Sequence, residues 1–211
     1  MAASSSLPRA GGYRRRHLLP MALLVIVLAV ASVLTWIVVF VNSTAQSVTS
    51  CNTPPSGGGT VEARTALDQT AAASPSAVAV RVLNGAGQRG QAQLAAVELG
   101  ELGMTEAAPP DNDPLYPAQD LSCVGQIRYG GDGASAARTL SLVVPCAELV
   151  DDGRQGAAVD LALGSDFRDI TPGAGVNDAL RALARGSESG APVPGTDPAS
   201  LSGLRDVDCS Q

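Results

Sequence analysis

The sequence contains no lysine, and its only histidine is His17. Without imidazole beyond that position, no Ser-His-Asp triad, Cys-His pair or histidine-ligated metal can form in the rest of the chain. Without lysine, the chain also lacks a P-loop lysine, a Ser-Lys dyad and a Schiff-base amine. These absences exclude most familiar enzyme chemistries, so we expect no catalytic residues, no cofactor and no metal.

Positive charge is scarce after residue 41. Residues 42–211 contain 10 arginines and all 20 acidic residues, which gives a formal charge of −10, whereas residues 1–41 carry +4. Nucleic-acid binding depends largely on neutralising phosphates, and a segment this acidic is a poor partner for DNA or RNA. We therefore expect no nucleic-acid partner.

One long run, Leu18–Val41, has no charged residue in 24 positions. As a helix it would extend about 36 Å, enough to cross a hydrocarbon core of about 30 Å with tilt. A cleaved signal peptide is the alternative, but its apolar region is about 7–15 residues long and ends at a small-residue cleavage site. The residues Val41-Asn42-Ser43-Thr44 form a weak site of that kind. The run predicts a single transmembrane helix.

Charge around this run predicts its direction. Arg14, Arg15 and Arg16 precede it directly, and the next positive residue is Arg64. Basic residues tend to stay on the cytoplasmic side of a membrane. We therefore expect a cytoplasmic tail over residues 1–17, anchorage in the cytoplasmic membrane, and an extracytoplasmic segment over residues 42–211.

All four cysteines lie beyond the apolar run: Cys51, Cys123, Cys146 and Cys209. An even number of cysteines in an exported segment predicts two disulfides. A four-cysteine zinc site usually shows C-x₂₋₄-C spacing, which is absent.

Three pairings are possible, and the spacing favours one of them. A strand of about 23 Å after Cys123, a turn and a helix of about 17 Å would bring Cys146 back near Cys123. A Cys123–Cys146 bridge would leave Cys51 and Cys209 to form the second disulfide.

Composition divides the exported part into three. Residues 42–76 are rich in Ser, Thr, Pro, Gly and Ala and predict a flexible linker. Residues 77–186 contain the strand-like and helical patterns and predict the folded domain. Residues 187–211 predict a C-terminal tail.

The folded domain has a regular predicted order. Apolar alternation predicts strands over 78–83, 104–108, 124–129 and 159–163, and helical patterns cover 91–102, 134–144 and 177–185. The expected fold is α/β (α+β), a small mixed sheet in the order β-α-β-β-α-β with helices packed on it. The first helix has an expected core stripe of Leu94, Ala95, Val97, Leu99 and Leu102.

A glycine motif, Gly85-x-Gly87-x-x-Gly90, follows the first strand and precedes the first helix. It matches a dinucleotide-binding fingerprint, with Glu106 as the later acid, but too little chain follows for two nucleotide-binding halves. The glycines instead allow positive φ angles and a close strand-to-helix turn. Free N–H groups at the helix start could still bind a hydroxyl, carboxylate or phosphate. The candidate binding turn consists of Asn84, Gly85, Gly87, Arg89 and Gly90.

The same region resembles a known family. Residues 80–90, VRVLNGAGQRG, are similar to the opening V-x-V-L-N-G-x-G-x-x-G of the LytR C-terminal domain family, and residues 163–167, LGSDF, resemble its closing L-G-x-D-aromatic motif. The resemblance covers about residues 77–169. It implies a role in maintaining the cell envelope and no established catalytic residues. The family's LytR-CpsA-Psr transferase domain has no room in this chain.

Several acidic residues suggest other kinds of functional site. Asp111-Asn112-Asp113 could suggest calcium, but Pro114 follows at once and the other ligands of a calcium loop are missing. Glu98, Glu101 or Glu148 could in principle serve a glycosidase-like reaction.

The leading hypothesis is a non-enzymatic envelope protein whose domain binds a cell-wall polymer or an envelope protein partner. The first alternative is a cell-wall hydrolase or glycopolymer-transferase accessory that uses carboxylate chemistry. A second alternative is a structural subunit of a membrane complex, joined through Leu18–Val41.

Overall fold

The computed structural model describes residues 18–44, 50–54, 57–191 and 193–209. The predicted cytoplasmic tail, residues 1–17, lies outside this description. The chain divides into two compact units, Met1–Gln46 and Ser47–Gln211, and each is described by itself.

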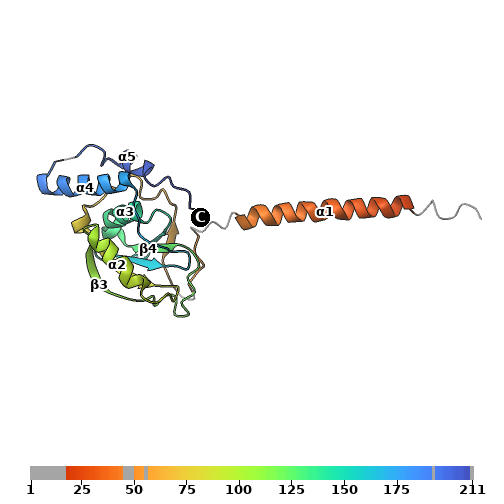
Figure 1. The fold of residues 1–211 in the computed structure, drawn as a ribbon, viewed down its shortest axis with the longest axis horizontal. Helices are drawn as coiled ribbons and strands as arrows, with labels where there is room; N and C mark the ends of the chain where they lie inside the picture. The colour runs from red at the N-terminus through yellow and green to blue at the C-terminus, as the bar shows by residue number, and fades with distance from the viewer. Residues whose placement is uncertain (1–17, 45–49, 55–56, 192, 210–211) are drawn as a thin grey trace, which may run out of the picture. The chain divides into compact units, whose positions relative to one another are not determined.

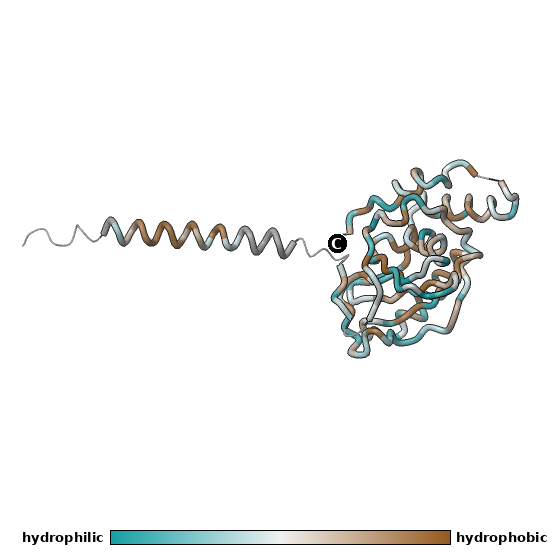
Figure 2. Tube along the Cα trace, turned by 180° about the vertical axis from the view of Figure 1, so that it is seen from behind, coloured by the Kyte–Doolittle hydropathy of each residue, from teal (hydrophilic) through white to brown (hydrophobic). Residues whose placement is uncertain are grey.

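The first unit contains one helix, α1 (Leu18–Thr44), which continues three residues past the predicted end of the apolar run. Its described turns are mostly hydrophobic in Figure 2, and its described side chains, from Pro20 to Trp36, are exposed. Within the described ranges, none of the helices combines the length and apolar character that crossing a bilayer requires. The transmembrane helix therefore stays a prediction.

The second unit is built on a six-stranded mixed sheet in the order β1-β5-β4-β6-β2-β3. Neighbouring strands are parallel in the pairs β2–β3, β2–β6 and β4–β5, and antiparallel in β4–β6 and β1–β5. The strands are β1 (Thr60–Glu62), β2 (Ala79–Asn84), β3 (Thr105–Asn112), β4 (Gly125–Tyr129), β5 (Glu148–Asp151) and β6 (Val159–Leu163). The mixed sheet with packed helices matches the predicted fold class, but four strands were expected.

The helices gather on one face of this sheet (Figure 1). Helix α2 packs on β2 and β3, α3 packs on β4, and α4 contacts α3. Their bounds are α2 (Gln91–Glu101), α3 (Ala134–Val143), α4 (Ala174–Ser189) and α5 (Pro198–Gly203), with short 3₁₀ turns η1 (Pro75–Ala77) and η2 (Gly131–Gly133).

The main core lies between the sheet and these helices. Strand residues Val82, Ile127 and Leu161 are no more than 2% exposed, as is Leu140 of α3. Side chains alternate between the faces of a strand, so every second residue of β2, β4 and β6 reaches this core. Each fully buried aliphatic side chain contributes about 1.5–3 kcal/mol, which makes this face the main source of stability.

A smaller cluster covers part of the opposite face. It combines Leu83 of β2 and Ala162 of β6 with Tyr116, Leu121 and Cys123 from the loop between β3 and β4. This face therefore carries a loop where the other carries helices.

The second half of the predicted linker belongs to the domain. Strand β1 pairs with β5, and Leu67 is 4% exposed within the main core. The predicted flexible linker is therefore wrong for residues 57–76. A three-residue strand is too short to show alternation, which is why composition alone indicated a linker.

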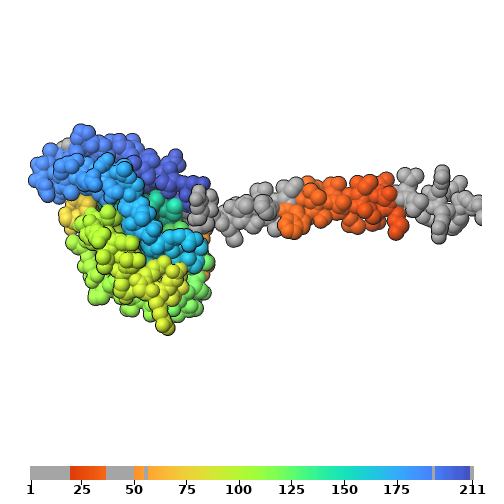
Figure 3. Space-filling model, in the orientation of Figure 1, coloured from red at the N-terminus to blue at the C-terminus, as the bar shows by residue number. Residues whose placement is uncertain are grey.

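The predicted C-terminal tail also folds back. Helix α5 begins after the cap Asp197, which accepts a hydrogen bond from the Ser200 N–H, and Leu201 is fully buried. In Figure 3 this last segment, in dark blue, covers one side of the domain. The prediction of a C-terminal tail is therefore wrong for residues 193–209.

The prediction for α2 needs one correction. Its length and the positive φ of Gly103 after it agree with expectation. However, Leu94 is 56% exposed and Val97 60% exposed, while the smaller Ala92 and Ala95 are buried with Leu99. Small residues let the helix approach the sheet closely, so the buried stripe is rotated away from the larger side chains.

Two other elements extend further than expected. Strand β3 continues through Pro109 and Pro110, because it is an edge strand and its missing N–H groups interrupt no second ladder. Helix α4 begins after Gly173, not at Asn177, and ends at Gly190, whose φ is 67°.

The disulfides are Cys51–Cys123 and Cys146–Cys209. The favoured pairing of Cys123 with Cys146, and of Cys51 with Cys209, is therefore wrong. The predicted strand and helix exist, but Cys123 packs in the loop-covered cluster, whereas the neighbours of Cys146, including Val144 and Ala147, belong to the helix-covered core. The spacing argument placed the two cysteines at one end of the sheet and ignored which face each occupies.

Candidate functional site

The predicted binding turn connects β2 to α2, and Asn84 shapes it. Its side-chain oxygen accepts hydrogen bonds from the N–H groups of Ala86 (3.2 Å) and Gly87 (3.0 Å). Its side-chain amide donates to the carbonyl of Gln88 at 3.0 Å. The buried Asn84 side chain is thus used inside the turn and is not free for a ligand.

The glycines of the turn have separate structural roles. A Cβ on Gly85 would lie 2.8 Å from a methyl carbon of Leu121 and 3.0 Å from the carbonyl oxygen of Leu163, so this position has no room for a side chain. Gly87 and Gly90 have φ angles of 72° and 78°, which favour glycine. Gly90 caps α2 without any side-chain cap.

A polar hollow of about 390 Å³ opens beside the turn. Four of the five predicted residues line it, and Gly85 does not. Arg89 is exposed at its rim and has no ion-pair partner among the described residues. Its lining residues are Asn84, Gly87, Arg89, Gly90, Ala92, Gln93, Pro110, Asp111, Asn112 and Gln119.

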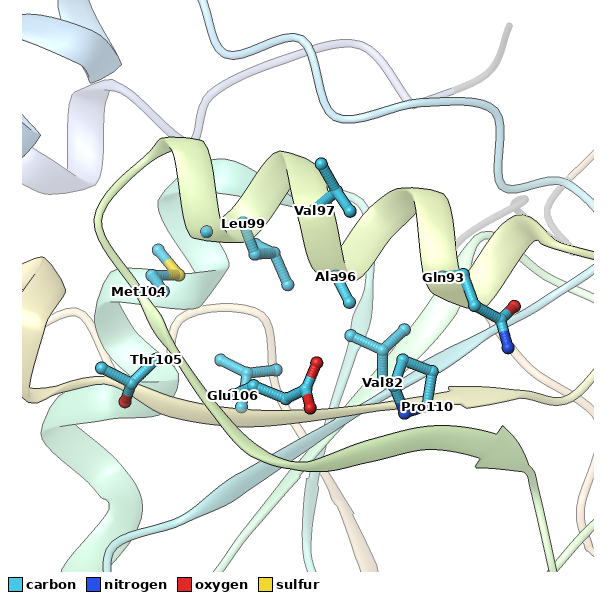
Figure 4. Close-up of a pocket in the computed structure, with 11 residues that line it drawn as sticks. Val82, Gln93, Ala96, Val97, Leu99, Met104, Thr105, Glu106 and Pro110 are labelled. Carbon is cyan, nitrogen blue, oxygen red and sulfur yellow. The ribbon is translucent and has the colours of Figure 1, made fainter.

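An apolar hollow of about 370 Å³ lies between α2 and the strands β2 and β3. Figure 4 shows the Glu106 carboxylate among its otherwise mainly apolar side chains, which include Leu99 and Met104. Gln93 and Pro110 line both hollows. The turn and the edge of the sheet therefore present adjoining polar and apolar surfaces.

The loop-covered face holds a buried ionic network around Arg128 of β4. Arg128 makes two hydrogen bonds to the carboxylate of Asp113, at 2.9 and 2.6 Å, and both side chains are at most 2% exposed. Its Nε and Nη2 also donate to the side-chain oxygen of Gln126, at 3.0 and 2.8 Å. The Tyr116 ring lies 5.8 Å from the guanidinium carbon, and burial raises the pKa of its hydroxyl.

The network continues to the first disulfide. Gln126 donates to Glu148 at 2.8 Å, and the other oxygen of Glu148 accepts from the Cys51 N–H at 3.3 Å. The Tyr116 hydroxyl donates to the carbonyl of Asn52. These contacts join the segment that carries Cys51 to β4 and β5.

A second ionic group on this face centres on Asp160 of β6. Arg81 donates to it at 3.0 and 2.6 Å, and Arg154 donates at 2.7 Å. Burial alone would raise the pKa of Asp160, but the hydrogen bonds from Arg154 and Arg81 outweigh it and lower that pKa below its ordinary value. Asp160 is thus held ionised by two arginines.

The other candidate acids are mostly engaged. Glu98 accepts from the Ile170 N–H at 3.2 Å, and Glu148 belongs to the network above. Glu101 is exposed and lines a different hollow together with Glu188. Asp113 is paired with Arg128, so the acidic triplet at residues 111–113 cannot offer it freely to calcium. In the described part of the chain, no group of three or more His, Cys, Asp or Glu side chains could hold a metal ion.

Sequence reasoning missed the arginine–carboxylate pairs. A signal was present: Gln126 and Arg128 alternate with the buried Ile127 in a strand whose five residues are all buried. A strand with polar residues at every second position and no exposed face needs buried polar partners. The sequence does not say that Asp113, in a loop, is that partner.

Comparisons with known proteins agree on one family. The family model described as "LytR cell envelope-related transcriptional attenuator" matches residues 77–167. The cell envelope integrity protein Cei of Mycobacterium tuberculosis is 35% identical over 205 residues, which cover 93% of this chain and 92% of that protein. The crystal structure of the soluble domain of a conserved hypothetical secreted protein from Mycobacterium marinum is 36% identical, with a TM-score of 0.64, and the match covers 72% of this chain and 98% of that one.

Proposed function

Because this chain belongs to the LytR C-terminal domain family, we propose that it supports the integrity of the cell envelope from outside the cytoplasmic membrane. It does so by binding a wall polymer or an envelope protein partner and catalyses no reaction. The observation that carries this proposal is the similarity to Cei along nearly the whole length of both chains.

The membrane anchor is part of the proposal. Its support is the uncharged run Leu18–Val41, which lies within α1, and the three arginines directly before it. The charge bias supports a position of the domain outside the cytoplasm. Two disulfides suit an oxidising compartment and support the same location.

The adjoining hollows beside α2 are the proposed binding surface. The exposed guanidinium of Arg89 and the amides of Gln93 and Gln119 can hold hydroxyl or carboxylate groups of a polymer. The apolar hollow next to them can take a methyl or lactyl-like group, and the exposed Val97 borders it. Polar groups that fix orientation beside an apolar patch are typical of small-molecule and polymer sites.

Carboxylate catalysis has weaker support. Glycoside hydrolysis needs two carboxylates placed on either side of the scissile bond. Glu98 and Glu148 each accept a backbone hydrogen bond that stabilises the fold, so neither is free to act as one of that pair. Only Glu101 of the three candidates is without such a bond among the described residues.

A sedimentation assay tests the binding proposal. The full chain in detergent is mixed with insoluble cell-wall material, and bound protein is measured against protein concentration. We expect Arg89→Ala to weaken binding at least about tenfold, because one charge-assisted hydrogen bond contributes about 1.5–3 kcal/mol and about 1.4 kcal/mol corresponds to a factor of ten. Arg181→Ala is the matched control, since Arg181 is an exposed arginine of α4 paired with Asp178.

The sedimentation assay and two further experiments separate the alternatives. Release of soluble wall fragments that Glu101→Gln abolishes would overturn the non-catalytic proposal. Equal binding by the Arg89 and Arg181 variants would remove the turn from the binding surface. Co-purification with membrane proteins that requires α1 and not the domain would favour a structural subunit. Resistance of the domain to protease added outside intact spheroplasts would contradict the proposed location.

A further inference from the structure

A second cluster of arginines lies away from the turn, where α3, α5 and the segment after β1 meet. Asp68 accepts hydrogen bonds from Arg138 at 3.0 Å and from Arg205 at 3.3 Å, both on the same carboxylate oxygen. The side chains of the two arginines are 0% and 5% exposed. One carboxylate therefore serves two buried guanidinium groups.

Arg64 adds a third positive charge. Its Nη2 donates to the carbonyl oxygens of Pro145 and Arg205, at 3.3 and 3.2 Å. Burial lowers the pKa of Arg205, and the nearby charge of Arg138 lowers it further. Arg64 and Asp206 are exposed, so the buried part of the cluster consists of Arg138, Arg205 and the half-buried carboxylate of Asp68. Removing a guanidinium group from water is unfavourable unless its donors are hydrogen-bonded, so the hydrogen-bond partners of the two buried arginines decide what the cluster can bind.

The unsatisfied donors of Arg205 lie along one edge of its guanidinium. Nη1 donates to the carbonyl oxygen of Arg64 and to Asp68. Nε and Nη2 are buried and have no hydrogen-bond partner among the described residues, as is also true of Nε of Arg138. The Nε–Nη2 edge is the fork with which arginine binds both oxygens of a carboxylate. Because both atoms are shielded from bulk water, a group seated in the cluster itself must satisfy them.

A hollow of about 360 Å³ opens at this cluster. It is lined by Arg64, Thr65, Asp68, Ser202, Arg205 and Asp206. The Ser202 hydroxyl donates to the Pro198 carbonyl at 2.7 Å and accepts from Arg138 at 3.0 Å. The Thr65 hydroxyl has no partner among the described residues and is available to a ligand.

We propose that this hollow binds a singly charged carboxylate, such as the end of a peptide chain. The Nε–Nη2 edge of Arg205 binds its two oxygens, and the Thr65 hydroxyl donates to one of them. A carboxylate is favoured over phosphate because it is planar and matches the fork. The site is separate from the turn at Asn84–Gly90, so the proposal stands independently of the proposed function.

The second disulfide holds this site together. Its residues come from three distant parts of the chain: 64–68, 138 and 202–206. Cys209 follows Arg205 by four residues and is bonded to Cys146, whose neighbour Pro145 accepts from Arg64. Opening this disulfide frees the segment that carries Arg205, and we expect the carboxylate site to be lost with it.

Nuclear magnetic resonance of the full chain in detergent micelles, labelled with ¹⁵N-arginine, tests the proposal. N-acetylglycine is the probe, N-acetylglycinamide is its neutral match, and inorganic phosphate is the competing anion, all at constant ionic strength. We expect N-acetylglycine to shift the Nε–H signal of Arg205 and to raise the melting temperature. The amide should do neither, and phosphate should bind at least tenfold more weakly.

Variants separate the fork from simple charge. R205K keeps the positive charge but loses the fork, and we expect at least tenfold weaker binding of N-acetylglycine. R181K is the matched control and should bind as the wild type does, since Arg181 is an exposed arginine of α4. The pair C146S/C209S should lose binding, whereas C51S/C123S should retain it. T65V, at a residue with an exposed side chain, should bind several-fold more weakly and serves if R205K does not fold.

Three results would overturn the proposal. The amide could bind as tightly as the acid, phosphate could bind more tightly than N-acetylglycine, or the Arg205 signal could stay unchanged at 100 mM probe. The first result would show that the negative charge of the probe is not recognised, the second that a planar carboxylate is not preferred, and the third that Arg205 does not take part in binding.

Discussion

The two faces of the sheet are stabilised in different ways. On one face, helices α2 and α3 bury aliphatic side chains such as Val82, Ile127 and Leu161. The other face carries two arginine–carboxylate groups, a fully buried one around Arg128 and one around Asp160 in which the Arg81 side chain is 39% exposed. Adjacent residues of one strand supply both, since Ile127 points to the first face and Arg128 to the second.

The two faces differ in how strongly they depend on interaction geometry and in which substitutions they tolerate. Aliphatic packing depends on area and volume, so many residues of similar size can replace one another. A buried ion pair depends on geometry, and removal of one partner leaves the other charge without compensation. We therefore expect the loop-covered face to respond more sharply to single polar substitutions.

The largest effect is expected for Asp113→Asn. It keeps the shape of the side chain and leaves Arg128 buried without a counter-charge, which should cost about 3–5 kcal/mol of unfolding free energy. Urea denaturation of the purified chain measures it. The double variant Asp113→Asn with Arg128→Met should lose less than Asp113→Asn alone. A loss below about 1 kcal/mol for the single variant would show that the pair contributes little.

The matching change on the helix-covered face is Leu140→Ala. Leu140 is fully buried, and the cavity left behind should cost about 2–5 kcal/mol. Leu140→Met, which nearly conserves volume, should cost less than about 1.5 kcal/mol in the same denaturation experiment. Equal losses for the two variants would contradict the view that this face depends mainly on volume.

Acid should weaken the loop-covered face through Asp160. Its folded pKa is lowered, so its contribution to stability is complete above its unfolded value of about 3.9 and is lost as the pH falls through the folded pKa. The urea midpoint, measured from pH 6 to pH 2, should fall less steeply below pH 4 in Asp160→Asn than in the wild type. Asp178→Asn, at an exposed pair, is the control, and an identical slope in all three proteins would contradict this expectation.

The smallest effects are expected on the outer side of α2. Leu94→Ser and Val97→Ser change exposed residues and should each alter stability by less than about 0.5 kcal/mol. Leu99→Ala, on the buried side of the same helix, should cost about 2–5 kcal/mol. A loss of unfolding free energy above about 1 kcal/mol for Leu94→Ser would indicate that Leu94 packs in the core, as the sequence pattern predicted.

The sequence predicted the elements that alternate over several residues. Strand β2, strand β6 and the helices α2 and α3 are all long enough to show a period. The short elements β1, β5 and α5 are not, and their positions depend on partners far along the chain. The same limit applies to β3, where two prolines suggested an end that an edge strand does not require.

The candidate sites also differ in how well a local sequence pattern reveals them. The glycine turn is recognisable because its residues are contiguous, and four of its five predicted members line one hollow. The Arg205 cluster joins residues more than 130 positions apart, with Asp68 and Arg205 separated by 137, so no local pattern reveals it. The disulfide prediction failed for a related reason: distance along the elements was considered, and the two sides of the sheet were not.

The connectivity of the disulfides bears on how the protein matures. The first cysteine pairs with the second and the third with the fourth, which closes two consecutive rings that do not enclose one another. A chain that emerges amino-terminus first presents Cys51 and Cys123 before either later thiol. An oxidase that joined cysteines in their order of appearance would therefore produce the native bonds directly, without a reshuffling step.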